Sequence, residues 1–167
     1  SKQKINVIRS IDTLVIDEIS MVRADLLDAV DSVLRRFRKN NLPFGGVQMV
    51  MIGDLGQLAP VAKDDEWQML SRYYATPYFF SSLALQRTRY AIVELTKVYR
   101  QSDKRFLDIL NKVRENHADA AVLSALNSRY IPDFKPRKED GYIRLTTHNW
   151  QAQRLNDHEL ELLPAKP

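Results

Sequence analysis

Two pairs of polar residues follow apolar stretches of this 167-residue chain. Asp17 and Glu18 come directly after one apolar run, and Asp54 and Gln57 come after another. A carboxylate at the end of a strand can hold Mg²⁺ beside the β- and γ-phosphates of a nucleotide, usually through bound waters. An adjacent carboxylate can orient and deprotonate the attacking water. The pattern therefore favours hydrolysis of a nucleoside triphosphate, with Asp17 holding the metal and Glu18 activating water.

Each of these residues also has a plainer interpretation. Asp17 and Glu18 can be solvated charges at the entrance of a helix. Gln57 lies in a loop that also carries Gly53 and Gly56, where it can be an ordinary turn residue. Its amide can instead bond a terminal phosphate or the attacking water without placing a charge there. The apolar run before each loop favours the chemical interpretation.

The elements that must position these residues alternate between strand and helix. The apolar runs 13–16 and 47–52 predict two fully buried strands. Residues 23–39 predict a helix between them. This order predicts an α/β fold with a parallel sheet and helices on both of its faces, and ligands in such folds bind beyond the carboxyl ends of the strands. The predicted helix has an apolar face (Leu26, Leu27, Val30, Val33, Leu34, Phe37) and an opposite face with Asp25, Asp28, Asp31 and Arg35.

The remainder of the chain predicts further helices and short strands. The helices are 67–74, 103–116 with Asp103 as its cap, 119–128, and one that begins near Asn149, and the strands are 78–80, 92–95 and 142–146. Residues 131–140 are rich in proline and charge, and predict an exposed loop.

A change in the layer pattern near residues 96–102 predicts a domain boundary, with one part at 1–96 and the other at 97–167. Arg100 lies at this junction. An arginine contributed by a neighbouring domain can neutralise charge on a transferring phosphoryl group. The alternative is an ordinary surface arginine.

Composition excludes several classes of protein. The chain has no cysteine, which excludes disulfides and thiolate metal sites. Its net charge of +4 is spread evenly, with 13 basic and 11 acidic residues up to Lys97 and 12 and 10 after it, so there is no basic arm. No apolar run approaches the roughly 20 residues of a membrane span. No signal-peptide pattern opens the chain, which predicts a cytoplasmic protein without a membrane partner.

Four boxes appear in order along the chain: Asp-Glu-Ile-Ser at 17–20, Gly-Asp-Leu-Gly-Gln-Leu-Ala-Pro-Val at 53–61, Tyr-Arg-Gln at 99–101 and Thr-Thr-His-Asn at 146–149. Over about residues 14–163 the chain resembles the RecD/PIF branch of superfamily 1 DNA helicases. In that family, two RecA-like domains clamp ATP between them and move 5′-to-3′ along single-stranded DNA.

The resemblance implies roles for individual residues. Asp17 would be the Mg²⁺ acid, Glu18 the general base, Gln57 the γ-phosphate sensor and Arg100 an arginine finger from the second domain. Residues 1–96 would be the late part of the first RecA-like domain, and 97–167 the early part of the second. The cofactors would be ATP and Mg²⁺, and the partners single-stranded DNA and duplex junctions.

The family's phosphate loop, Gly-x-x-x-x-Gly-Lys-Ser/Thr, does not occur in the 167 residues. We expect it before Ser1 and the late motifs of the second domain after Pro167, because both ends look like cuts within a longer protein. We therefore expect the chain by itself to be inactive.

The fourth box is a candidate DNA contact. Backbone N–H groups and hydroxyls between a strand and a helix can hold a phosphate, and the residues that would do so are Thr146, Thr147, His148 and Asn149. The alternative is a helix cap formed by Asn149 with a turn before it. Trp150 can stack on a base, although a core position is favoured.

Two other functions fit parts of the sequence. One is a stand-alone nucleic-acid-binding module without turnover, and the other is an Mg²⁺-dependent nuclease that uses Asp17, Glu18 and Asp54. The buried parallel strands and Gln57 favour the ATPase over the nuclease. The oligomeric state does not follow from the sequence.

Overall fold

The computed structural model describes residues 2–163, apart from the side chain at position 138. Contacts divide the chain into two units, residues 1–122 and 123–167, which are described separately. The helices are α1 (Lys2–Ser10), α2 (Ala24–Arg38), α3 (Asp64–Leu70), α4 (Leu83–Gln86), α5 (Lys104–Arg114), α6 (Ala120–Asn127) and α7 (Asn149–Glu161). The strands are β1 (Thr13–Ile16) and β2 (Gln48–Met51), and the short 3₁₀ turns are η1 (Ile19–Met21), η2 (Pro43–Gly46), η3 (Phe79–Ser81) and η4 (Lys138–Asp140).

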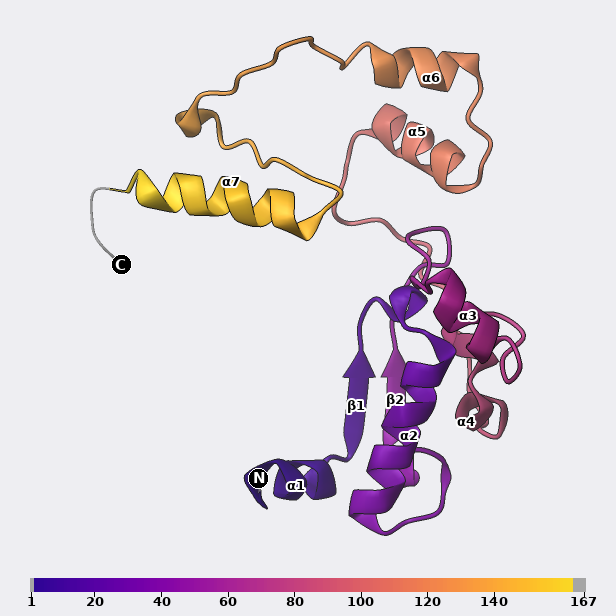
Figure 1. Ribbon diagram of the computed structural model, residues 1–167. Helices are drawn as coiled ribbons and strands as arrows, with labels where there is room; N and C mark the ends of the chain where they lie inside the picture. The colour runs from indigo at the N-terminus through magenta and orange to yellow at the C-terminus, as the bar shows by residue number, and fades with distance from the viewer. Residues whose placement is uncertain (1, 164–167) are drawn as a thin grey trace. The chain divides into compact units, whose positions relative to one another are not determined.

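β1, α2 and β2 form a strand–helix–strand unit, in which the two strands are parallel and lie beside the helix (Figure 1). Thr13 pairs with Gln48 and Ile16 pairs with Met51, so the two carboxyl ends lie at the same edge of the sheet. This is the parallel α/β arrangement that the alternating pattern predicts, and it positions the acidic pair and the Gln57 loop at one edge.

α2 covers one face of the sheet. Leu27 and Leu34 of this helix are buried together with Phe44 of η2. Each such side chain contributes about 1.5–3 kcal/mol through removal of apolar surface from water. The residues of the sheet that pack against this cluster are the alternate positions Leu14, Ile16, Met49 and Met51.

The prediction that the strands are fully buried is wrong for their other face. Val15 and Val50, which pair with one another, are 56% and 37% exposed. Successive side chains of a strand point to opposite faces, and α2 packs on only one of them. Among residues 2–163, no helix covers the face that carries Val15 and Val50.

The acidic residues of α2 do not form a purely solvated face. Asp31 is 4% exposed, and its carboxylate accepts a hydrogen bond of 2.6 Å from the Phe44 N–H. Leu26 and Val33, predicted for the apolar face, are instead 51% and 43% exposed. The helix is therefore rotated relative to the prediction, because the turn η2 and helix α4 supply hydrogen-bond donors to the buried Asp31 and the half-buried Asp28.

Asp28 joins α2 to the segment before α4. Its carboxylate accepts hydrogen bonds from the Ser82 hydroxyl (2.6 Å), the Tyr74 hydroxyl (2.9 Å) and the N–H groups of Leu83 (3.1 Å) and Ala84 (2.9 Å). Burial, together with the hydrogen bond to Asp28, raises the pKa of Tyr74 to about 12. This cluster anchors the chain that follows the Gln57 loop to the core.

Three predicted strands are absent from residues 2–163. Tyr78 forms a single antiparallel bridge with Arg23 before the chain enters η3. Residues 92–95 and 142–146 have no regular structure, and the side chains of Ile92, Ile143 and Leu145 are 85%, 86% and 90% exposed. An apolar β-branched run becomes a strand only beside a partner strand, and the described residues place none next to these two.

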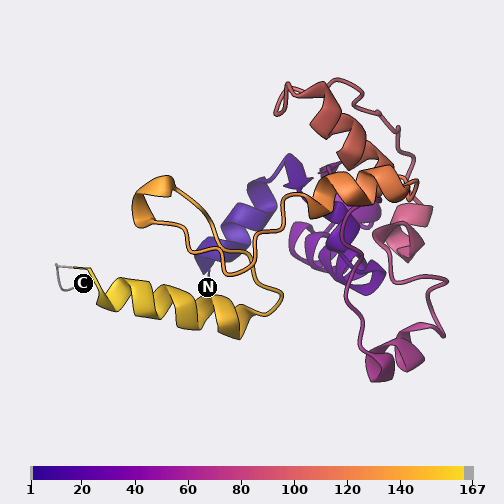
Figure 2. The same ribbon diagram turned by 90° about the horizontal axis from the view of Figure 1, so that it is seen from above.

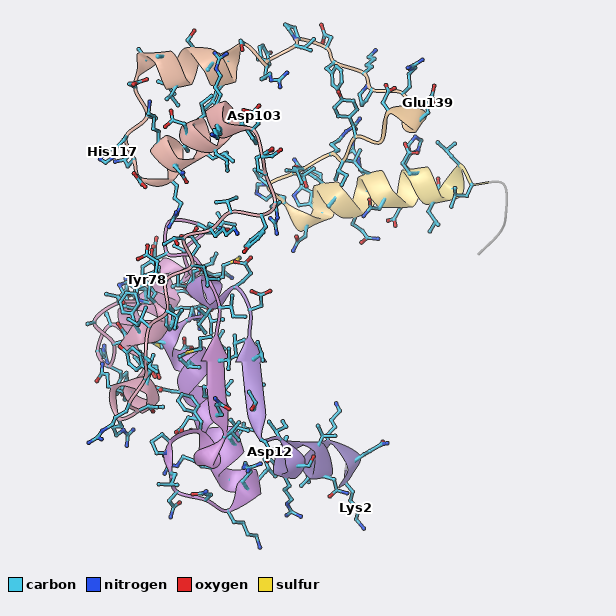
Figure 3. All side chains as sticks on the ribbon, turned by 180° about the vertical axis from the view of Figure 1, so that it is seen from behind. Lys2, Asp12, Tyr78, Asp103, His117 and Glu139 are labelled. Atoms are coloured by element: carbon cyan, nitrogen blue, oxygen red, sulfur yellow. The ribbon has the colours of Figure 1, made fainter. Side chains whose placement is uncertain are left out.

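The predicted helices after residue 100 are confirmed. Asp103 caps α5 by accepting hydrogen bonds from the N–H groups of Arg105 (2.9 Å) and Phe106 (3.1 Å), and Figure 3 labels Asp103 and His117 near the two ends of this helix. Residues 128–147 form an open loop between α6 and α7, with η4 within it (Figure 2). No helix among residues 2–163 has the length and apolar composition of a bilayer span.

Candidate functional site

Backbone hydrogen bonds bring the two candidate turns together at the carboxyl edge of the sheet. Ile52 donates its N–H to the carbonyl oxygen of Ile16 at 2.9 Å, and Ile19 donates to the carbonyl oxygen of Ile52 at 2.9 Å. A Cβ atom on Gly53 would lie 2.9 Å from Ile19 Cγ2 and 3.1 Å from the backbone nitrogen of Ser20. Glycine is therefore needed at position 53 for the second turn to approach the first.

The acid turn has an unusual backbone. Glu18 adopts the left-handed conformation, with φ 51° and ψ 41°, which costs about 1–2 kcal/mol for a residue with a Cβ atom. Its N–H donates to Asp17 Oδ1 at 2.9 Å. The next residues, Ile19 and Ser20, are 4% and 1% exposed and hold the turn in place. As a result, both carboxylates are exposed, and the backbone of the turn is held by the hydrogen bonds of Ile16 and Ile19 to Ile52.

Asp54 is the hydrogen-bonding centre of the Gln57 loop. Its Oδ1 accepts from the Gly56 N–H at 2.9 Å, and its Oδ2 accepts from the Gln57 side-chain Nε2 at 3.2 Å. The Gln57 N–H donates to the Asp54 carbonyl oxygen at 3.0 Å. These three bonds define the shape of the loop and the direction of the glutamine amide.

Arg114, in the last turn of α5, forms an ion pair with the same carboxylate. Its Nε lies 3.2 Å from Asp54 Oδ1 and 3.1 Å from Oδ2. The hydrogen bond from the Gly56 N–H is the main cause that lowers the pKa of Asp54, with further contributions from the Gln57 amide and the Arg114 charge, while partial burial opposes them. All of these contacts favour the ionised carboxylate.

The structure does not bring all predicted site residues into contact. The Gln57 amide is bonded to Asp54 rather than to Asp17 or Glu18. The Arg100 side chain is exposed, and in the part of the chain that the structure describes no hydrogen bond or ion pair involves it. The roles inferred for Asp17, Glu18, Gln57 and Arg100 therefore stay predictions, as does the domain boundary after residue 96.

The candidate DNA segment lies in the second unit and is exposed. His148, not Asn149, is the N-cap residue of α7, and it makes no side-chain capping bond. The Thr146 hydroxyl donates to the His148 carbonyl oxygen at 3.2 Å, and the Thr147 hydroxyl lies 2.9 Å from His148 Nδ1. Trp150 is 61% exposed rather than in the core. The alternative of an Asn149 cap is thus wrong, and the role of this segment in DNA binding stays a prediction.

No cluster of three or more acidic or histidine side chains suited to a metal occurs among the described residues. Asp54 uses both carboxylate oxygens within its own loop and with Arg114. Asp54 is therefore less accessible to a metal ion than Asp17 and Glu18, whose carboxylates are exposed. A single carboxylate such as Asp17 still suits Mg²⁺, because this ion keeps several waters and takes its remaining ligands from substrate phosphates.

The sequence pattern singled out Asp54 but assigned it no part in ATP hydrolysis, and it did not indicate Arg114. The signal for Asp54 was available, since an aspartate two residues before a glycine in a short loop commonly accepts the N–H of that glycine. Arg114 gave no such signal, because it lies 60 residues from Asp54 along the chain.

Comparisons with known proteins agree with this architecture. A family model described as PIF1-like helicase matches residues 1–122. The ATP-dependent DNA helicase RRM3 of Saccharomyces cerevisiae is 46% identical over 101 residues, which are 60% of this chain and 13% of that protein. The ATP-dependent DNA helicase PIF1 of Homo sapiens is 38% identical over 156 residues, which are 92% of this chain and 22% of that protein.

Solved structures give the same result. A crystal structure of Pif1 helicase from Bacteroides in complex with ADP-AlF3 and ssDNA matches with a TM-score of 0.87 and 37% identity, over 99% of this chain and 39% of that one. Pif1 helicase from Candida albicans matches with a TM-score of 0.75 and 27% identity, over 99% of this chain and 35% of that one. The present chain therefore spans only a minor part of each relative.

Proposed function

The chain belongs to the PIF1-like helicase family, and from this premise we propose that it is part of an ATP-dependent DNA helicase, within which it supplies the water-activating side of the ATP site. The observation that carries the proposal is the common sheet edge, where the acid turn and the Gln57 loop are joined by backbone hydrogen bonds through Ile19 and Ile52. The relatives named as ATP-dependent DNA helicases support the same assignment.

In the proposed reaction, the Glu18 carboxylate accepts a proton from the water that attacks the γ-phosphate. Its exposure suits this role, because a base must reach a water molecule rather than a protein partner. The backbone constraint on the turn matters because a base that is held in position loses less entropy when it meets the reacting atoms.

Asp17 would hold Mg²⁺, and the ion would neutralise charge on the phosphate oxygens. The Glu18 N–H bonds Asp17 Oδ1 and so restrains the orientation of this carboxylate. Gln57 would contact the γ-phosphate or the attacking water from the neighbouring loop. Arg100 would neutralise charge on the transferring phosphoryl group once it is brought to the site.

The DNA partner is proposed from the family and from the relatives. Two related structures are described as bound to ssDNA, and another concerns unwinding of forked duplex DNA. We propose single-stranded DNA as the track of the parent protein, with Thr146, Thr147, His148 and Asn149 as candidate contacts to its phosphates.

The test uses the full-length parent with Glu18→Gln. This change keeps the size and polarity of the side chain but removes the base. We expect DNA-stimulated ATP hydrolysis to fall about 10²- to 10⁴-fold, while the affinity for ATP is retained. The matched control is Glu94→Gln, an exposed glutamate outside the proposed site, which should leave hydrolysis unchanged.

Normal turnover by Glu18→Gln would remove this residue from its role. A parent that binds single-stranded DNA in a salt-dependent manner but never hydrolyses ATP would instead support the alternative, a nucleic-acid-binding module without turnover. We also expect the 167-residue chain by itself not to hydrolyse ATP.

A further inference from the structure

The side chain of Gln57 is held by a carboxylate rather than left free. Asp54 Oδ2 accepts a hydrogen bond from Gln57 Nε2 at 3.2 Å, and Asp54 Oδ1 holds the Gly56 N–H at 2.9 Å. A carboxylate without a proton cannot donate a hydrogen bond, so the amide oxygen of Gln57 cannot take the place of its nitrogen. Asp54 therefore determines which end of the amide is turned away from the loop and is available to a ligand.

The Asp54 carboxylate also forms an ion pair with a residue from a distant part of the chain. Arg114 Nε lies 3.2 Å from Asp54 Oδ1 and 3.1 Å from Oδ2. A Cβ atom on Gly56 would lie 2.8 Å from Arg114 Cγ and 3.3 Å from Arg114 Nε. The arginine side chain therefore packs directly over the loop, and Gly56 leaves the space that it needs.

The two halves of this contact come from different predicted domains. Asp54, Gly56 and Gln57 precede the boundary predicted after residue 96, whereas Arg114 follows it in the last turn of α5. Because Arg114 is attached to a helix, its guanidinium moves with that helix. A displacement of α5 would therefore release the carboxylate that holds the Gln57 amide.

We propose that Asp54 is the positioning residue for Gln57, and that Arg114 makes the orientation of this glutamine depend on the position of α5. The inference rests on the proposed function, since it assumes that Gln57 meets the γ-phosphate or the attacking water. It adds to that function a coupling, in which a change in the position of α5 alters the ATP site through one ion pair.

The pair is poorly suited to a purely structural role. The Arg114 side chain is 52% exposed and that of Asp54 is 25% exposed. Ion pairs at such exposed positions are screened by water and add little to the stability of a fold. Misplacement of a group that contacts reacting atoms by about 1 Å can, by contrast, slow a reaction about 100-fold. Measurements of catalytic rate and of fold stability therefore distinguish a structural role of this ion pair from a positioning role.

The experiment measures DNA-stimulated ATP hydrolysis by the full-length parent. Asp54→Asn keeps the shape of the side chain and one oxygen that can accept the Gly56 N–H. It replaces the oxygen that accepts from Gln57 with an amide nitrogen, and it removes the negative charge that pairs with Arg114. Arg114→Gln removes the charge, and Arg114→Lys retains it. We expect kcat to fall about 10- to 100-fold for Asp54→Asn and about 10-fold for Arg114→Gln, with partial recovery in Arg114→Lys and little change in KM for ATP.

The decisive arm repeats both substitutions in a Gln57→Ala background. If Asp54 and Arg114 act through Gln57, neither change lowers kcat further once that side chain is absent. The matched control is Lys112→Gln, which breaks an exposed ion pair of 3.2 Å with Asp108 on the same helix and should leave kcat unchanged. Thermal unfolding of every variant should stay within a few degrees of the wild type.

Two results would overturn the inference, and they can be told apart. If Gln57→Ala lowers kcat but Asp54→Asn and Arg114→Gln leave it unchanged, or lower it equally with and without Gln57, the positioning role is wrong while the proposed function stands. If Gln57→Ala itself has no effect, the role proposed for Gln57 fails and the inference fails with it.

Discussion

Residues 11–88 and residues 89–163 both carry predicted site residues, but they hold them in different ways. In the first region, backbone hydrogen bonds through Ile19 and Ile52 tie the turn of Asp17 and Glu18 to the segment that follows β2, and Asp54 holds Gln57. In the second, Arg100 and the segment 146–149 are exposed. Apart from Val122, the buried apolar side chains among the described residues all lie between Ile19 and Leu85.

This difference concerns what determines the shape of a turn that carries a predicted site residue. A turn becomes specific in shape when groups distant in sequence take up its hydrogen bonds, as Ile52 does for the acid turn and Arg114 for the Gln57 loop. We propose that site residues held only by their near neighbours along the chain acquire their functional position from another body. For Arg100 and the segment 146–149, the proposed bodies are the rest of the ATP site and the DNA.

The largest expected effect is on the rate of ATP hydrolysis, and it concerns Arg100 of the second region. An arginine that neutralises a transferring phosphoryl group contributes about 10³- to 10⁵-fold in rate, or roughly 4–7 kcal/mol of barrier. Arg100→Ala in the full-length parent should lower kcat by that factor, although the side chain has no partner among the described residues. The measurement is ATP turnover at saturating DNA. A loss below about tenfold would leave Arg100 an ordinary surface residue.

A second test compares packing in the two regions. Phe44 is 1% exposed within the core cluster, whereas Phe106 of α5 is 41% exposed. Phe44→Ala should lower the free energy of unfolding by about 3–5 kcal/mol, because it leaves a cavity. Phe106→Ala should cost about 1 kcal/mol. Urea denaturation of the 167-residue chain measures both values. Equal losses would mean that the second region is packed as tightly as the first.

The pH dependence of the free energy of unfolding tests the contribution of Asp28 to the stability of the first region. Burial acts to raise the pKa of Asp28, but the hydrogen bonds from Ser82, Ala84, Leu83 and Tyr74 outweigh it, and the net shift is downward. A carboxylate with a lowered folded pKa stabilises the fold above its unfolded pKa, and this contribution is lost as the pH falls through the folded value.

We therefore expect the free energy of unfolding to fall below about pH 4, and to fall less steeply in Asp28→Asn. The variant should also lose about 1–3 kcal/mol near neutral pH, because it weakens several partly buried hydrogen bonds to a charge. Denaturant titrations of both proteins at several pH values measure these quantities. Parallel curves for the two proteins would show that Asp28 does not contribute to the acid sensitivity.

The smallest expected effect concerns the backbone of Glu18. Glycine adopts φ near 51° without the penalty of a Cβ atom, but it also loses more entropy on folding. Glu18→Gly should raise the free energy of unfolding by about 0.5–1 kcal/mol, while the same change in the parent removes hydrolysis. Glu18→Ala, which keeps the Cβ atom, is the control and should give no gain in stability. Equal stabilities of the two variants would show that the turn is not strained.

Local pattern predicted much of the first region. The two apolar runs, the helix between them and the order of these elements imply a parallel α/β sheet, because a parallel connection requires a crossover. The same order predicts that Asp17 and Gln57 share one sheet edge, and the register of β1 with β2 agrees with it. Periodicity carries this information because it reports which side of an element meets the core.

Only the tertiary structure decided the rest. It turned Asp28 and Asp31 inward, placed Glu18 in the left-handed region and joined Asp54 to Arg114 across 60 residues. It also left residues 92–95 and 142–146 without strand pairing among the described residues, although their composition is typical of strands. Strand pairing and buried carboxylates need a partner that is distant in sequence, and the periodicity of a single segment carries no information about that partner.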